Sequence, residues 1–170
     1  NRPTLSIAAR PLSHGRKLVL ALKHGDRHDI AAPAARWMLR AAGDMLAENM
    51  LVAPVPLHWT RLFQRRFNQS AELARAIAKQ KKISAIDDAL ARVRATPPQV
   101  GLAREERAKN VHGAFAIEKN FRSKVKGKRI VLVDDVLTTG ATANACARVL
   151  RRAGAAKVDV LTLARVVDQV

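Results

Sequence analysis

Two adjacent acids and a threonine-rich turn follow one another between residues 129 and 142. The run RIVLVDD (129–135) is apolar until it closes on Asp134 and Asp135, and the loop VLTTGAT comes next. Carboxylates accept hydrogen bonds from sugar hydroxyls, whereas threonine hydroxyls and the unpaired amides of a helix start donate them. The loop residues that offer such donors or a tight turn are Thr138, Thr139, Gly140, Ala141 and Thr142. Because a helix N-terminus carries partial positive charge, we expect a phosphate on the amides and a ribose on the carboxylates.

A purely structural explanation of this segment exists. Asp and Thr are common helix caps, so these residues would need no ligand to account for them. For an isolated D-x-x-T-T-G sequence this explanation would be preferred. Here an apolar strand, paired acids, a threonine turn and a helix occur in one order, and that combination favours ligand binding.

The elements around the segment predict the fold class. Residues 139–154 have helical spacing with Gly154 as the expected C-cap, and 158–167 is another apolar run. A strand, helix and strand joined by short connections predict a right-handed parallel crossover, and buried parallel strands are unbroken apolar runs. We therefore expect an α/β fold with an open, mostly parallel sheet flanked by helices. In such sheets ligands bind beyond the carboxyl ends of the strands, where Asp134 and Asp135 lie.

The remaining segments give weaker indications of structure. Helices are predicted at 13–24, 29–47 (with Asp29 as N-cap) and 69–80, a strand at 50–56, a weak strand at 89–94, and a polar, irregular stretch from there to about Gly113.

Length and composition limit the class of protein. The 170 residues suit one domain, 1–170, and 48% apolar residues are too many for a disordered tail. No apolar stretch approaches the roughly 18 residues that span a bilayer, so no membrane partner is expected. The single cysteine, Cys146, excludes an internal disulfide framework and fits a reducing compartment, which predicts a cytoplasmic protein. The chain begins at Asn1 and not at Met, as a piece of a longer protein would.

The charge points to phosphate-bearing partners. Lys and Arg total 31 against 14 Asp and Glu, a formal net charge of +17. Such an excess attracts phosphate on either a small metabolite or a polymer such as single-stranded nucleic acid. Basic residues are densest at 61–82 and at 119–129. A solvated polar face is the alternative for both clusters, and for 119–129 we prefer it.

The run IVLVDDVLTTGAT (130–142) resembles the phosphoribosyl pyrophosphate (PRPP) signature of type I phosphoribosyltransferases. That resemblance implies that Asp134 and Asp135 bind the ribose hydroxyls and that the loop through Thr142 binds the 5′-phosphate. The chain also resembles the ComF/GntX-type competence protein family at ALKHGDR (21–27), at 54–78 and at 96–115. It departs from that family at Arg66, where members usually have Gly. Full-length members commonly carry a cysteine-rich, zinc-ribbon-like N-terminal segment, and because this sequence contains no Cys pair, that segment is either absent or was cut away.

The resemblance extends to two further segments. The loop after residue 55 is similar to a pyrophosphate-binding loop. This resemblance implies that Arg61, with Arg65 or Arg66, binds the pyrophosphate leaving group. A basic solvent face is the alternative. Residues 94–112 are similar to a flexible loop that closes over the substrate, and Arg104, Arg107 and Asn110 are spaced to share one helical face. An ordinary exposed loop is the alternative there.

Three functions remain open at this stage. The first is a phosphoribosyltransferase that uses Mg²⁺ with PRPP, in which Asp134, Asp135 and Arg61 act on the substrate and no residue is assigned as a direct metal ligand. Its nitrogenous acceptor is unidentified, and an oligomer is possible. The second is a non-catalytic sensor of PRPP or a nucleotide, and the third is a competence protein that binds single-stranded DNA.

Overall fold

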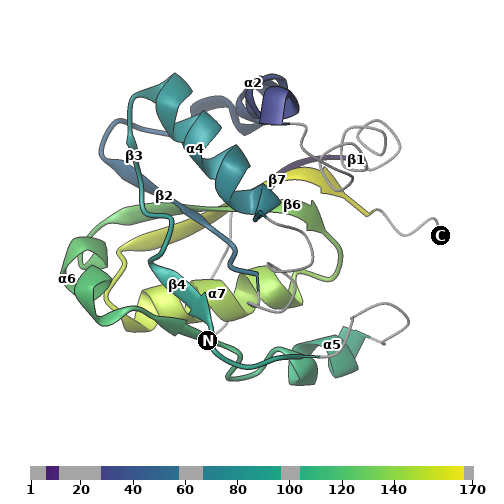
Figure 1. The fold of residues 1–170 in the computed structure, drawn as a ribbon, viewed down its shortest axis with the longest axis vertical. Helices are drawn as coiled ribbons and strands as arrows, with labels where there is room; N and C mark the ends of the chain where they lie inside the picture. The colour runs from purple at the N-terminus through teal and green to yellow at the C-terminus, as the bar shows by residue number, and fades with distance from the viewer. Residues whose placement is uncertain (1–6, 12–27, 58–66, 97–103, 167–170) are drawn as a thin grey trace.

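A parallel five-stranded sheet forms the middle of the structure, with helices on both of its faces (Figure 1). The computed structural model describes residues 7–11, 28–57, 67–96 and 104–166. The sheet strands are β1 (Ile7–Pro11), β2 (Met50–Pro54), β3 (Ser84–Ala85), β6 (Arg129–Leu137) and β7 (Lys157–Arg165). They lie in the order β1-β7-β6-β2-β3, and every neighbouring pair is parallel. The predicted fold class, an open and mostly parallel sheet flanked by helices, is therefore confirmed.

Each face of the sheet has its own apolar core. Helices α2 (Ala31–Ala42) and α4 (Gln69–Lys81) pack through Met38, Leu73 and Ile77 against Val131 and Val133 of β6. On the opposite face, α7 (Ala141–Arg152) packs through Cys146 and Leu150 against Ile130 and Leu132. Successive β6 side chains alternate between the two cores because a strand has a period of two. This two-sided burial explains why β6 is a continuous apolar run.

The chain leaves β2 and β6 in opposite directions. After β2 it passes through α4 to β3 at the sheet edge, whereas after β6 it passes through α7 to β7 on the other side. The two helices also cover opposite faces. Because β2 and β6 are neighbours, the sheet has a topological switch point between them, which is the usual ligand position in open α/β sheets.

A small antiparallel unit lies beside the main sheet. It consists of β4 (Leu90–Arg92), β5 (Phe115–Ile117) and the short helix α5 (Arg104–Asn110). Arg94 joins its parts, because Nη2 donates to the carbonyls of Asn110 (3.0 Å) and His112 (2.7 Å). A 3-10 turn η3 (Lys119–Phe121) and helix α6 (Arg122–Val125) then lead back to β6.

Several sequence predictions need correction. The single helix expected at 29–47 is broken: α2 is preceded by the 3-10 turn η1 (His28–Ile30) and followed by η2 (Gly43–Met45), because Gly43 has φ 52° and leaves the helical region. Ile30, and not Asp29, occupies the N-cap position. The stretch expected to be irregular before Gly113 contains α5, and β1, β3, β5 and α6 were not predicted. The helix expected at 13–24 lies outside the described residues.

The other predicted elements are present, with boundaries shifted by a few residues. Helix α7 ends at Arg152, one residue before the Ala153 cap, and Gly154 follows with φ 98°. No helix within the described ranges has the length and apolar character that crossing a membrane requires.

Candidate functional site

Asp134 and Asp135 lie where β6 extends past its neighbour β2. The β2–β6 pairing ends at Pro54 and Val133, followed by one bond from the Val55 amide to the Val133 carbonyl (2.8 Å). Strand β6 continues to Leu137 and is paired there only with β7. The two acids are therefore positioned at the switch point, beyond the carboxyl end of β2, as the sequence predicted.

Both carboxyl groups are held by specific hydrogen bonds. Asp134 Oδ1 accepts from Ser70 Oγ (3.1 Å) and from the Asp135 amide (3.0 Å). Asp135 Oδ1 accepts from the Val136 amide (2.8 Å). Both acids are half-buried as whole residues.

The environment makes Asp134 hard to ionise. Burial of its carboxyl, reinforced by repulsion from Asp135, raises the pKa of Asp134 to about 8, although the bonds from the Asp135 amide and Ser70 act in the opposite direction. At neutral pH Asp134 therefore keeps its proton, as one of two closely spaced carboxyl groups does. A neutral Asp134 repels a bound phosphate less than an ionised one would.

The start of α4 positions Ser70. Asn68 caps this helix by accepting from the Ser70 amide (3.0 Å), and its Nδ2 donates to the Val55 carbonyl (3.1 Å). One side chain thus joins the end of β2 to the first turn of α4. Ser70 itself is only 5% exposed, which fixes its hydroxyl against Asp134.

The loop before α7 is shaped like an anion site. Gly140 stands at the N-cap position in the left-handed conformation (φ 75°, ψ 6°), where a Cβ would be strained. The N-cap residue has no side chain to cap α7, and the first turn of the helix contains no acid. Thr139 Oγ1 is buried and has no hydrogen-bond partner among the described residues. An anion at this helix start would accept hydrogen bonds from the first helix amides and from this hydroxyl.

Beside the loop before α7, the carboxyl oxygens that could hold a metal ion are those of Asp134 and Asp135. Within the described ranges no three His, Cys, Asp or Glu side chains are close enough to form a metal site. Two carboxyl groups on their own fit Mg²⁺ better than a transition metal, because Mg²⁺ prefers oxygen and takes most of its ligands from water and substrate.

The structure describes only some of the other predicted site residues. Thr138 is exposed, and Ala141 and Thr142 are half-buried at the start of α7, so the whole predicted 5′-phosphate loop comes together beside the acids. Arg61, Arg65 and Arg66 lie outside the described residues. Arg104, Arg107 and Asn110 are all on α5, and Arg107 and Asn110 are half-buried.

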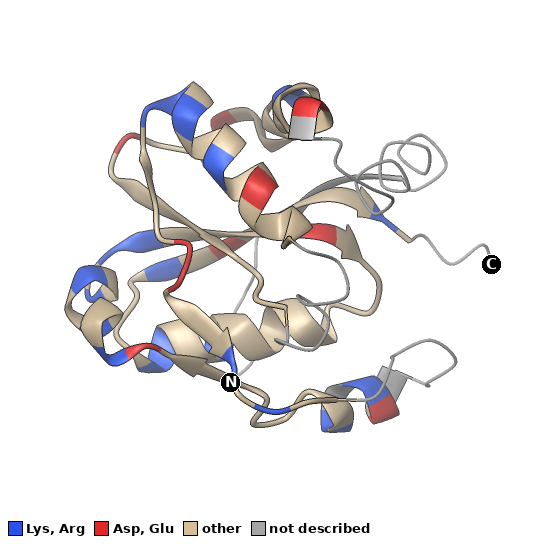
Figure 2. Cartoon of the chain, viewed as in Figure 1, with Lys and Arg blue, Asp and Glu red and all other residues tan. Residues whose placement is uncertain are grey.

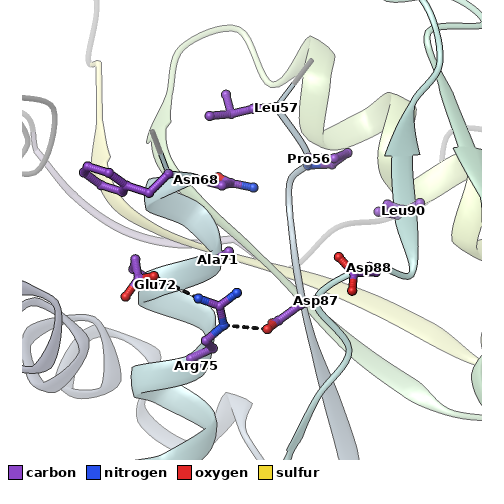
Figure 3. A pocket seen from close by; sticks show the side chains of 10 residues that line it. Pro56, Leu57, Asn68, Ala71, Glu72, Arg75, Asp87, Asp88 and Leu90 are labelled. Atoms are coloured by element: carbon purple, nitrogen blue, oxygen red, sulfur yellow. Dashed lines mark hydrogen bonds and ion pairs between the residues drawn. The ribbon is translucent and has the colours of Figure 1, made fainter. Parts of the chain in front are cut away.

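A cavity of about 530 Å³ lies between the end of β2, the first turns of α4 and the β3–β4 connection (Figure 3). Its apolar lining comprises Pro56, Leu57, Phe67, Ala71 and Leu90. The polar part of its wall comprises Asn68, Glu72, Arg75, Asp87 and Asp88. Arg75 bridges two of the acids, Glu72 (2.8 Å) and Asp87 (2.6 Å). With three acids and one arginine, the cavity does not suit an anionic group. The loop before α7, with no acid in the first turn of the helix, is better suited to an anion than this cavity is.

Sequence reasoning missed Ser70 and Asn68. Ser70 is 64 residues from Asp134, so no local spacing could pair them. One available signal was the position of Asn68 directly before a helical pattern, which is typical of an N-cap.

Comparison with known proteins agrees with this geometry. Residues 68–169 match the phosphoribosyl transferase domain family. The chain is 35% identical over 169 residues to the DNA utilization protein YhgH of Escherichia coli K12, covering 95% of this chain and 70% of that one. It is 33% identical over 153 residues to competence protein F of Haemophilus influenzae, covering 87% and 66%.

Two solved structures share the fold. One is the allosteric regulatory enzyme of purine biosynthesis, with TM-score 0.54, 23% identity and 80% of this chain covered. The other is the glutamine PRPP amidotransferase of B. subtilis, with TM-score 0.53, 22% identity and 84% covered. This chain spans only 26% and 30% of those two proteins, so the likeness concerns the fold alone. Together with the family match, the parallel sheet and the loop after β6, these relatives show that the chain belongs to the type I phosphoribosyltransferase family, in the branch of competence protein F and YhgH.

Proposed function

We propose that the chain binds PRPP at the carboxyl edge of the sheet and transfers its phosphoribosyl group to a nitrogenous acceptor. The observation that carries this proposal is the uncapped start of α7, with Gly140 in the left-handed conformation, next to the Asp134–Asp135 pair. The helix start suits the 5′-phosphate, and the acids suit the two ribose hydroxyls. Membership of the phosphoribosyltransferase family supports this assignment.

The proposed reaction is a displacement at C1 of the ribose. A nitrogen of the acceptor forms a bond to C1, the bond from C1 to the pyrophosphate oxygen breaks, and the acceptor nitrogen loses its proton. Positive charge develops on the sugar, so the site would act by holding the ribose and stabilising the departing anion. Asp134 and Asp135 would orient the ribose, and Arg61, with Arg65 or Arg66, would contact pyrophosphate. Mg²⁺ bound with PRPP would supply neutralisation of the pyrophosphate charge.

We assign closure over the substrate to the segment that contains α5, with Arg104, Arg107 and Asn110. Helix α5 contacts α7 and lies between β4 and β5 along the chain. Closure of this basic segment would exclude water and bring positive charge to the leaving group.

Release of pyrophosphate tests the catalytic part of the proposal. The protein is incubated with PRPP, Mg²⁺ and a panel of purine, pyrimidine and amine acceptors, and pyrophosphate is measured with a coupled enzyme assay. Acceptor-dependent release that the Asp134→Asn/Asp135→Asn variant loses is the expected result. Saturable PRPP binding with no release from any acceptor would contradict catalysis and leave the sensor function.

A second candidate function is the handling of DNA. The net charge of +17 favours it, as do the names of two relatives, a DNA utilization protein and a competence protein. A charge of this size is far more than one PRPP molecule requires. In this function the PRPP site and a nucleic-acid surface would be separate parts of one protein.

A further inference from the structure

The edge of the sheet opposite the phosphate loop is strongly basic. Nine exposed Lys and Arg side chains gather around η3, α6, the starts of β6 and β7 and the end of α7 (Figure 2). They are Lys119, Arg122, Lys124, Lys126, Lys128, Arg129, Arg151, Arg152 and Lys157, and we call them the amino-edge basic face. Sequence alone displayed only the 119–129 part of this face, for which a solvated surface was the preferred explanation.

Backbone contacts join the two parts of the face. The Gly127 amide donates to the Gly154 carbonyl (2.8 Å), and the Ala156 amide donates to the Lys128 carbonyl (2.8 Å). Arg129 and Lys157 are paired in the β6–β7 register. The connection between α6 and β6 therefore lies directly beside the connection between α7 and β7, and their cations form one surface.

Few of these charges are neutralised by acids. Asp159 is fully buried and lies near Lys157 (2.9 Å) and Arg129 (3.7 Å), which accounts for two cations. Glu118 is the one exposed acid in the described stretches 118–129 and 148–157. Arg122, Lys126, Lys128 and Arg152 have no ion-pair partner within the described residues. Like charges crowded in this way repel one another, and an anionic partner would relieve that repulsion.

Local structure explains only part of the face. Arg151 and Arg152 complement the negative end of α7, and Arg151 also donates to the carbonyls of Ala155 and Ala156. Lys124 lies over the ring of Phe121 at 4.9 Å. No such role applies to Lys126 and Lys128, which flank Gly127 in an exposed turn.

We propose that the amino-edge basic face binds the phosphodiester backbone of nucleic acid, independently of base sequence. The cations come from several elements and are exposed at the surface, which suits a polymer with repeated phosphates. Phe121 is the one aromatic residue among the described residues of the face, and it is half-buried beneath Lys124, so the face has no platform for stacking bases.

The face is distinct from the PRPP site. Arg129 begins β6 and Asp134 lies five residues further on, which corresponds to roughly 17 Å along a strand. The phosphate loop lies further still in the same direction. This inference rests on the DNA-handling candidate above, to which it adds a surface, and it does not depend on PRPP binding.

Charge reversal at the turn tests the proposal. Lys126→Glu/Lys128→Glu is compared with wild type by fluorescence anisotropy, using a labelled 30-nucleotide single strand and its duplex at several salt concentrations. A matched control, Arg36→Glu/Arg40→Glu, makes the same charge change at exposed positions on α2, which covers the other face of the sheet. The uncharged variant Lys126→Gln/Lys128→Gln removes the two positive charges without adding negative ones. A thermal melt of each protein shows whether a loss of binding reflects lost contacts or lost folding.

The expected result is a loss of affinity of about tenfold or more for the turn variant, a smaller loss for the Gln variant, and a smaller loss again for the control. The slope of log K against log salt should fall in magnitude by about 1.4–1.8 when two phosphate contacts are removed.

Equal losses of affinity in the turn variant and the α2 control would overturn the assignment of binding to this surface, while leaving the handling of DNA intact. No oligonucleotide binding by wild type would overturn both the surface and the handling of DNA. PRPP titration of the turn variant shows independently whether the other site is intact.

Discussion

At the scale of single residues, the site depends on one unusual carboxyl group. The adjacency of Asp134 and Asp135 can be read from the sequence, and it predicted their shared position. The raised pKa of Asp134 cannot be read there, because it comes from burial and from repulsion by Asp135, which the hydrogen bond from Ser70 on α4 opposes. Sequence reasoning therefore places the two acids at one edge of the sheet but does not tell which of them keeps its proton.

The raised pKa of Asp134 predicts a fall in stability as pH rises. Between pH 3.8, the ordinary value, and about 8, the folded protein holds a proton that the unfolded chain has released. The free energy of unfolding therefore decreases across this range and levels off above it. Asp134→Asn should remove this pH dependence and melt at a higher temperature than wild type at pH 9, with an increase of ~2–4 °C for each kcal/mol by which the buried, ionised carboxylate destabilises the wild-type fold.

Thermal unfolding followed by circular dichroism at pH 5 and pH 9 measures this difference. Asp88→Asn, at an exposed acid, is the control for the change in net charge. An Asp134→Asn variant whose melting temperature falls as steeply with pH as that of wild type would be inconsistent with a buried, protonated Asp134.

At the scale of elements, long regular segments were predictable and short ones were not. β6, α7 and β7 were found because an apolar run buried on two faces and a helix of 12 residues leave clear patterns. β3 has two residues and β5 has three, so neither shows a period, and each exists only through pairing with a distant strand. Helix α5 was missed because its seven residues are almost all polar.

The turn into α7 predicts that substitution of Gly140 weakens PRPP binding as well as lowering stability. Gly140→Ala places a Cβ at φ 75°, which should lower the free energy of unfolding by about 1–2 kcal/mol. It should also weaken PRPP binding, because the amides around residue 140 would move. Gly127→Ala is a matched control, since Gly127 has φ 72°, a Cβ added there would meet nothing within 4 Å, and the residue lies at the other edge of the sheet.

Urea unfolding and PRPP titration of the two variants give the comparison. Both should lose similar stability, and only Gly140→Ala should lose affinity. A Gly140→Ala protein that binds PRPP as tightly as Gly127→Ala does would contradict a role for this turn in holding phosphate.

At the scale of the whole molecule, the parallel sheet separates two regions with different chemistry. The carboxyl edge carries the acids and the open helix start, and the amino edge carries the basic face. The sequence showed an excess of 17 positive charges but could not assign them to an edge, because that depends on strand order. It likewise predicted a parallel sheet but not the order β1-β7-β6-β2-β3, which no local pattern encodes.

The central claim is that the carboxyl edge binds PRPP, and calorimetric titration with PRPP and Mg²⁺ tests it most directly. Wild type is measured beside Asp134→Asn/Asp135→Asn and beside Asp87→Asn/Asp88→Asn, a second adjacent acid pair that lines the cavity and not the phosphate loop. We expect saturable binding to wild type and to the cavity variant, and a loss of roughly 100-fold in the site variant if each lost hydrogen bond to ribose contributes about 1.5 kcal/mol. Absence of binding by folded wild type, or equal affinity of wild type and the site variant, would contradict the claim.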